Sequence, residues 1–193
     1  MVTGRILPVV ERAQRRDETR TPPVVERGAQ RRDETQRPPA WDIAASVHDP
    51  EIPVLSIADL GVLREVQAEG DAVTVTITPT YSGCPAMDTI RDDLVLALTA
   101  AGFAHVDVRT VLAPAWTTDW ITPHGREALA AFGIAPPGPV TARSGPIPLR
   151  LSVKCPNCGS LDTRELARFG STSCKALYQC RACDEPFDHF KAH

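Results

Sequence analysis

The stretch AVTVTITPTYSGCPAMDTIRDDLVLALTAA, residues 72–101, decides the fold of the first half of the chain. Val73, Val75 and Ile77 alternate with threonines, which is typical of a strand with one buried face. Pro79 breaks this pattern because proline cannot donate to a strand ladder. Apolar residues then recur at helical spacing until Gly102, and they are Met87, Ile90, Leu94, Ala97, Leu98 and Ala101. The stretch therefore predicts a strand, a loop and a helix.

Cys84 lies at the end of this loop, directly before Pro85, which suits the first position of a helix. Unpaired backbone N–H groups and the helix dipole favour an anion at such a position. We therefore expect a lowered pKa for Cys84, which would favour a reactive or metal-binding thiolate. The alternative is that Cys84 is a small buried apolar residue, a common role for a free cysteine. The residues alone leave both interpretations open.

Two further strands are expected around this stretch. Residues 62–68 are followed by Glu69-Gly70-Asp71, which predicts a hairpin with the strand that begins at Ala72. Residues 105–112 predict a third strand, joined to the second by a helical crossover. Short helices are expected near Trp41 and after Thr122-Pro123. The predicted fold class is α/β, a small two-layer sandwich with a mixed sheet of about three strands.

The loop after the third predicted strand contains Trp116 and Trp120. We expect them to pack on the sheet edge because most tryptophans are largely buried, with a partner surface as the alternative.

Composition divides the chain of 193 residues into four parts. Residues 1–39 contain a duplicated arginine-rich segment with little apolar material, and we expect them to be disordered. A basic arm that docks on an acidic partner is the alternative for this tail. Residues 40–134 form the expected α/β domain, residues 135–150 a Pro/Gly-rich linker, and residues 151–193 a second module.

The net charge of -3 is unevenly distributed. Residues 1–40 hold nine arginines against six acidic residues, whereas residues 41–193 hold twelve basic against eighteen acidic residues. An acidic folded part is a poor nucleic-acid binder. No apolar run approaches the roughly 18 residues of a membrane span, and the first ten residues do not form a secretory signal. We expect a cytoplasmic protein that binds neither nucleic acid nor membrane.

Five of the six cysteines fall between residues 155 and 183. Cys155 and Cys158 form one CxxC pair, and Cys180 and Cys183 form a second. Two such turns can supply a tetrahedral shell of four thiolates, and zinc is preferred over iron. A module of this size has little core, so we expect the metal to stabilise the fold. Cys174 remains a spare thiol, a replacement ligand or a sign of an iron–sulfur centre.

Two sets of motifs carry a resemblance to a known family. The first set is Asp49-Pro-Glu-Ile-Pro53, Asp59-Leu-Gly61 and Thr78-Pro-Thr-Tyr-Ser-Gly-Cys-Pro85, and it resembles the iron–sulfur-cluster assembly domain of SufT-type factors. The second set is Cys155-Pro-Asn-Cys-Gly-Ser160, Phe169-Gly-Ser-Thr-Ser-Cys-Lys-Ala-Leu-Tyr178 and Glu185-Pro-Phe187. Together they resemble the PaaD (PaaJ) family, the accessory subunit of phenylacetyl-CoA 1,2-epoxidase, over residues 41–193.

The resemblance implies a non-catalytic subunit for aerobic phenylacetate degradation. It implies that the chain helps to mature an iron or iron–sulfur centre, with oxygenase or reductase subunits or the assembly machinery as partners. A homodimer is also compatible. By this resemblance Cys84 would contact transient iron or sulfide, and Asp49 and Glu51 could shape the same pocket. The alternative for Asp49-Pro-Glu51 is a turn that ends a helix.

Two other functions compete with this one. An independent enzyme could use Cys84 as a nucleophile, with His48, His105 or His124 as the base, although none has diagnostic spacing. A nucleic-acid-binding zinc ribbon would need a basic face. Asp184 next to the second cysteine pair argues against such a face.

Overall fold

The computed structural model describes residues 39–138 and 153–192. The disorder predicted over residues 1–39 lies outside the described residues except for Pro39, which begins a helix, and the linker predicted over residues 135–150 is described only as far as residue 138. All described residues belong to the same compact unit.

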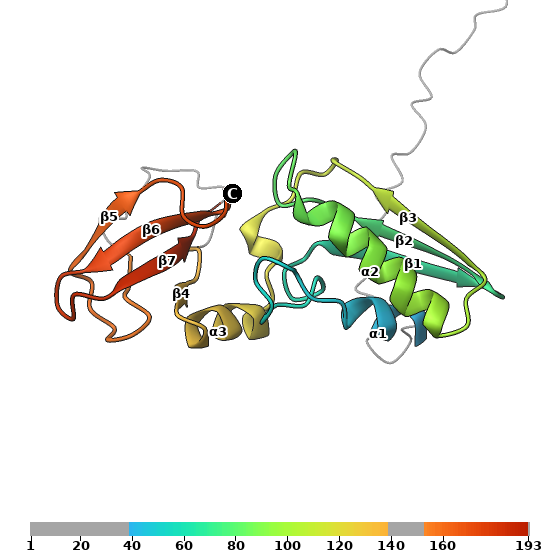
Figure 1. Cartoon of the computed structure of the whole chain (residues 1–193), viewed down its shortest axis with the longest axis horizontal. Coiled ribbons are helices and arrows are strands. Elements are labelled where there is room, and N and C mark those ends of the chain that lie inside the picture. Colours follow the sequence, from blue (N-terminus) through green and yellow to red (C-terminus); the bar gives the residue numbers. More distant parts are fainter. Residues whose placement is uncertain (1–38, 139–152, 193) are drawn as a thin grey trace, which may run out of the picture. The chain divides into compact units, whose positions relative to one another are not determined.

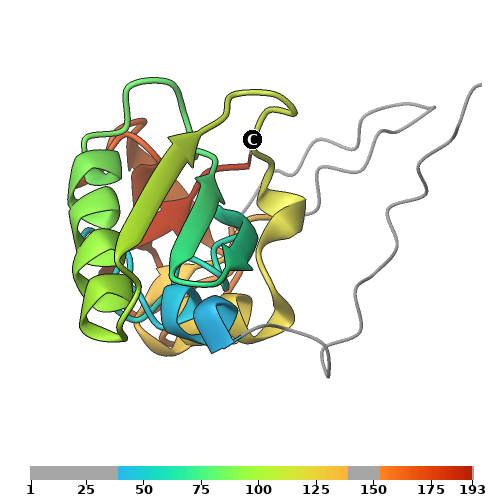
Figure 2. The same cartoon turned by 90° about the vertical axis from the view of Figure 1, so that its right-hand side faces the viewer.

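The first sheet has three strands in the order β1-β2-β3 (Figure 1). β1 (Leu63–Glu69) pairs with β2 (Ala72–Ile77) in the antiparallel sense, and β2 pairs with β3 (His105–Thr110) in the parallel sense. The crossover contains α2 (Ala86–Ala100), which lies along one side of the sheet in Figure 2. The predicted mixed sheet of about three strands is confirmed.

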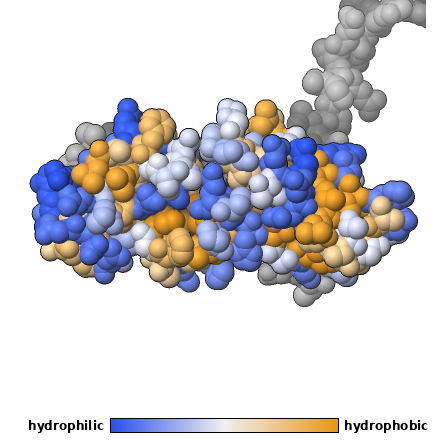
Figure 3. All heavy atoms as spheres, viewed as in Figure 1, coloured by the Kyte–Doolittle hydropathy of each residue, from blue (hydrophilic) through white to orange (hydrophobic). Residues whose placement is uncertain are grey.

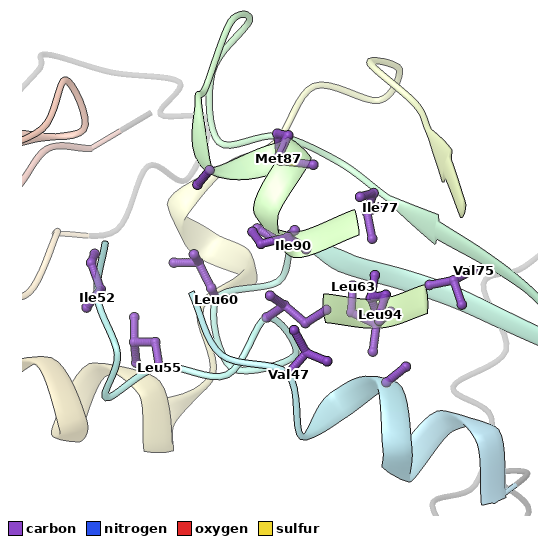
Figure 4. Packing of buried hydrophobic residues seen from close by; sticks show 14 of the residues in the cluster. Val47, Ile52, Leu55, Leu60, Leu63, Val75, Ile77, Met87, Ile90 and Leu94 are labelled. Atoms are coloured by element: carbon purple, nitrogen blue, oxygen red, sulfur yellow. The ribbon is translucent and has the colours of Figure 1, made fainter. Parts of the chain in front are cut away.

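The core of this domain follows the predicted periodicities. Burial alternates along β2, where Val73, Val75 and Ile77 point inward. The buried face of α2 consists of Ala86, Met87, Ile90, Leu94 and Leu98. Figure 4 shows side chains of α2, β1, β2 and the segment between Val47 and Leu60 converging on one core. The helix α1 (Pro39–Ala45) adds Ala40 and Ala44 to it.

The segment after β3 packs back against the first domain. Trp116 is only 6% exposed and donates from its indole nitrogen to the carbonyl of Leu60 at 3.0 Å. The prediction that Trp116 packs is therefore confirmed. A short 3-10 helix, η2 (Thr118–Trp120), precedes α3 (Pro123–Ala131). Thr122 caps α3 by accepting from the backbone N–H of Gly125.

Asp59 anchors this returning segment. One carboxylate oxygen accepts from the Thr122 hydroxyl at 2.7 Å, and the other accepts from Ser56 at 2.9 Å. Gly61 has a φ of 75°, and a Cβ built there would lie 2.6 Å from the Cβ of Trp120. The Asp59-Leu-Gly61 motif therefore has a structural role, because only glycine fits this close approach.

The second sheet has four strands in the order β4-β7-β6-β5. Three of them form an antiparallel ribbon of β5 (Thr163–Ala167), β6 (Lys175–Cys180) and β7 (Pro186–Phe190). β4 (Ile134–Ala135), which follows α3, pairs in parallel with β7. The chain of the first domain thus extends directly into the sheet of the second.

A shared core joins the two sheets. Phe190 of β7 is fully buried, and its ring centroid lies 6.0 Å from that of Trp116. Cys174 and Phe190 belong to the same buried cluster as Leu94 and Leu129. The ribbon therefore packs on the core of the first domain.

Within the described ranges, no helix has the length and apolar character needed to cross a membrane. The face drawn in Figure 3 carries hydrophilic and hydrophobic residues interspersed.

Candidate functional site

Four cysteines of the ribbon meet in one cluster. The Sγ atoms of Cys155, Cys158, Cys180 and Cys183 all lie within 4.8 Å of one another. The Cys155 and Cys183 sulfurs are 3.9 Å apart, and the Cys158 and Cys180 sulfurs are 3.5 Å apart. A tetrahedral zinc site with Zn–S bonds of about 2.3 Å requires sulfurs about 3.8 Å apart. The cluster therefore fits a four-coordinate zinc ion.

Tight backbone turns produce this cluster. The Gly159 N–H donates to the Cys155 carbonyl at 3.0 Å, and Gly159 has a φ of 77° that relieves the bend. In the second turn, the Ala182 N–H donates to the sulfur of Cys180 at 3.4 Å. Each CxxC sequence therefore folds locally into a turn that presents two sulfurs on one side.

The electrostatics of the cluster differ from those of four isolated thiols. Burial disfavours the Cys180 thiolate, but hydrogen bonds from the backbone N–H groups of Cys183 and Ala182 lower the pKa of Cys180 to about 7. A hydrogen bond from the Glu185 backbone favours the Cys183 thiolate, yet burial and the neighbouring sulfurs raise the pKa of Cys183 to about 12. A bound cation would offset this repulsion between sulfurs.

Cys174 lies outside this cluster. It is 4% exposed and belongs to the core shared with the first domain, whereas Cys155 and Cys180 belong to a separate small core. Its sulfur lies 3.0 Å from the hydroxyl oxygen of Thr172. Cys174 is therefore not one of the sulfurs that the structure brings together in the ribbon.

Cys84 lies immediately before the N-cap of α2, which is Pro85. Its N–H donates to the Tyr81 carbonyl at 3.3 Å, and its own carbonyl accepts from the N–H of Met87 at 3.4 Å. The side chain is partly buried and packs against the main core. The thiol thus combines a fixed backbone position with partial access to solvent.

The expected lowering of the Cys84 pKa is wrong. Burial is the largest influence and raises the pKa of Cys84, and the carboxylates of Glu51 and Asp49 raise it further. Hydrogen bonds from the Ala86 backbone and the Thr80 side chain act in the opposite direction but do not prevail. The surroundings of this thiol disfavour an anion and favour a cation.

Asp49 and Glu51 lie near enough to Cys84 to act on its charge. Asp49 is 6% exposed, and its Oδ1 atom accepts from the N–H groups of Glu51 at 2.8 Å and Ile52 at 2.9 Å. Burial raises the pKa of Asp49 against these two bonds and the positive charge of Lys175. Asp49 therefore shapes the turn and also contributes negative potential around Cys84.

The sequence placed Tyr81 in the loop that ends at Cys84, but sequence reasoning missed its proximity to the ribbon and the contact of Lys175. Burial raises the pKa of Tyr81, and Ser173 of the ribbon and Cys84 both lie near enough to act on it. Lys175 is 5% exposed, and its Nζ lies 3.7 Å from a carboxylate oxygen of Asp188. Both contacts span residues far apart in sequence, so no local pattern indicated them.

The histidines considered as bases for Cys84 have other contacts. Nδ1 of His124 is 3.2 Å from Oδ1 of Asp59, His105 begins β3 opposite Ala72, and His48 forms a β-bridge with Ser56. None of these contacts brings a histidine to the Cys84 thiol.

Comparison with known families agrees with this division of the chain. Residues 44–110 match the model of the iron–sulfur cluster assembly protein family, and residues 142–191 match the PaaD zinc beta ribbon domain. The fold, the cluster of four cysteines and these two matches therefore define an iron–sulfur assembly domain joined to a zinc ribbon.

The similar proteins include one relative over most of the chain. A protein of Escherichia coli (strain K12), named as one of the subunits of 1,2-phenylacetyl-CoA epoxidase, is 47% identical over 151 residues, which cover 78% of this chain and 90% of the relative. The chain belongs to the PaaD family.

Two other similarities are confined to part of the chain. An Fe-S protein maturation auxiliary factor of Porphyromonas gingivalis is 36% identical over 90 residues, which cover 46% of this chain and 82% of that protein. A crystal structure of a domain of unknown function from Bacillus anthracis is 26% identical, with a TM-score of 0.44, and the match covers 47% of this chain and 87% of that one.

Proposed function

We propose that this chain is a non-catalytic accessory subunit of a 1,2-phenylacetyl-CoA epoxidase system and helps to mature an iron or iron–sulfur centre of that system. The names of the Escherichia coli and Porphyromonas gingivalis relatives support the two halves of this proposal. Its partners would be the oxygenase or reductase subunits, or the assembly machinery that loads them.

One observation carries the maturation role: Cys84 is a partly exposed thiol within electrostatic reach of the carboxylates of Asp49 and Glu51. Thiolate and carboxylate oxygen are both ligands of iron in proteins. The raised pKa of Cys84 means that binding of a metal must displace a proton, so iron can be held and then released. Cys84 would thus receive iron or sulfide as cargo.

The same surroundings argue against an independent thiol-dependent enzyme. A nucleophilic cysteine needs a stabilised thiolate, usually with a histidine base within hydrogen-bond reach. Here burial and two carboxylates raise the pKa of Cys84, and no histidine is among the groups that act on this pKa.

We also propose that Cys155, Cys158, Cys180 and Cys183 hold a zinc ion that stabilises the ribbon. The ion would cross-link the two CxxC turns, and this would stabilise a ribbon whose own core is small. A site of four thiolates suits a reducing cytoplasm, where we propose that the chain acts.

The maturation role is tested by purifying the epoxidase from cells that carry Cys84→Ala and measuring its iron content and activity. We expect both to fall at least about tenfold, as is typical when a side chain that supports metal binding is removed. The matched control is Ser82→Ala, an exposed residue of the same loop, which should leave both at wild-type values. Wild-type iron content and activity with Cys84→Ala would refute the proposal.

A further inference from the structure

One face of the ribbon sheet packs on the assembly domain, and Phe190 of β7 lies in that shared core. Because neighbouring residues of a strand point to opposite faces, His189 lies on the other face, paired with Ala176 of β6. Tyr178, two residues further along β6, is on the same face and pairs with Glu165 of β5. The ribbon therefore presents a second face that the shared core does not use.

This second face contains a cavity of about 460 Å³. Ala176 contributes only a methyl group to this face, which leaves space beside the larger rings of Tyr178 and His189. The volume falls within the roughly 300–1,000 Å³ that is typical of small-molecule sites. Apart from two alanines, the lining consists of side chains with aromatic rings or charges: Glu165, Arg168, Phe169, Tyr178, His189 and Lys191.

Two aromatic side chains give the cavity flat apolar walls. The hydroxyl of Tyr178 donates to Oε2 of Glu165 at 3.1 Å, and the Tyr178 ring centroid lies 5.4 Å from that of His189. These two contacts fix the orientation of the Tyr178 ring. Phe169 is 69% exposed, so the fold gains little from burying it. Rings in such positions can stack on the ring of a bound molecule.

Two cationic side chains lie beside these aromatic walls. Nζ of Lys191 donates to the Arg168 carbonyl at 3.2 Å and lies 4.5 Å from the centroid of the Phe169 ring. The Arg168 guanidinium makes no hydrogen bond or ion pair with residues 39–138 or 153–192. Its fork of N–H groups is therefore available for a carboxylate or a phosphate.

The charges of the lining favour an anion. Glu165 is its acidic residue, and the Glu165 carboxylate already accepts from Tyr178. Burial lowers the pKa of His189 to about 4, so this imidazole is neutral near pH 7. Two positive charges, those of Arg168 and Lys191, therefore face one negative charge, and we expect the cavity to attract anions.

We propose that this cavity binds a small molecule in which a planar aromatic ring carries an anionic group. The ring would pack against Tyr178 and Phe169, and the anionic group would bind Arg168 and Lys191. A nucleotide and an aromatic carboxylate both have this chemistry. The inference does not depend on the proposed handling of iron at Cys84, because Cys84 does not line the cavity.

The test is isothermal titration calorimetry of the zinc-loaded full chain with adenosine monophosphate and, separately, with benzoate. We expect at least one of them to bind with a Kd below about 1 mM. Tighter binding of adenosine monophosphate would identify the ligand as a nucleotide, and tighter binding of benzoate would identify it as an aromatic carboxylate. Adenosine and benzamide, which lack the charge, and inorganic phosphate, which lacks the ring, should each bind at least about tenfold more weakly.

Two variants locate the binding in the cavity. Arg168→Gln should weaken binding of the preferred ligand at least about tenfold, because a charge-assisted hydrogen bond is lost. Phe169→Ala should weaken it at least about fivefold, because a stacking surface is lost. The matched control is Arg164→Gln, which removes an exposed cation of β5 that does not line the cavity, and it should bind as wild type. All three positions are exposed, so we expect the zinc content and circular dichroism of the variants to match wild type.

Three results would overturn the inference. The first is the absence of saturable binding of either ligand up to about 10 mM. The second is inorganic phosphate bound as tightly as the preferred ligand, and the third is an equal loss of affinity in Arg168→Gln and Arg164→Gln. Either of these last two results would mean that charge alone attracts the anion and that the cavity does not recognise the ring.

Discussion

Replacement of Phe190 by alanine tests whether the ribbon and the assembly domain share one core. The Phe190 side chain is fully buried, and its ring packs on Trp116 with centroids 6.0 Å apart. Truncation of a buried phenylalanine costs about 3–5 kcal/mol, through lost burial and the cavity that remains. We expect the free energy of unfolding to fall by about 4 kcal/mol, a large part of the roughly 5–15 kcal/mol of a typical domain.

The measurement is urea unfolding of the zinc-loaded full chain, followed by tryptophan fluorescence and circular dichroism. Phe169→Ala is the matched control because Phe169 is 69% exposed and contacts Lys191 through its ring. Loss of such an exposed contact should cost less than about 1 kcal/mol. If Phe190→Ala costs no more than Phe169→Ala, the shared core does not stabilise the protein and the reasoning fails.

Three further predictions concern single side chains. Gly61→Ala should lower the unfolding free energy by about 3 kcal/mol, because its Cβ would meet Trp120, whereas Gly70→Ala, also at positive φ but in open space, should cost about 1 kcal/mol in the same urea assay. Asp49→Asn keeps the acceptor oxygen and removes a buried charge whose pKa burial raises. The variant should therefore be at least as stable as wild type at pH 7, and this advantage should shrink as the pH falls through the raised pKa and wild type is protonated; a variant less stable at pH 7 would contradict this. Burial lowers the pKa of His189 to about 4, so wild type should lose stability as the pH falls from about 6.5 to about 4, where only the unfolded state gains the proton. Unfolding curves of His189→Phe should lack this component, and identical pH profiles for the two proteins would be inconsistent with a buried neutral imidazole.

In the assembly domain, patterns over neighbouring residues predicted several helices and strands correctly. The alternation of Val73, Val75 and Ile77 predicted β2 and its buried face, and the helical spacing from Met87 onward predicted α2 to within one or two residues. Thr122-Pro123 predicted the start of α3, where Thr122 is the N-cap. Strand alternation, helical spacing and helix caps depend on residues that are close in sequence, so the sequence alone predicts them.

The candidate site was only partly predictable for the same reason. Its position before α2 followed from Pro85, but the pKa direction of Cys84 did not, because burial and the carboxylates of Asp49 and Glu51 outweigh the helix N-terminus. A helix N-terminus lowers a thiol pKa only where burial and nearby negative charge do not outweigh it. The electrostatic balance is set by the packing of segments that sequence spacing does not describe.

The amino-acid sequence by itself determined the elements, the two CxxC turns and the family, since periodicity, turn chemistry and ligand spacing act over a few residues. Only the tertiary structure decided that β4 joins the ribbon sheet and that Phe190 packs on Trp116. It also separated Cys174 from the other ribbon cysteines and placed it in the core of the assembly domain. Such contacts form because apolar surfaces that are far apart in sequence are buried against each other and away from water. No local pattern specifies which surfaces pair.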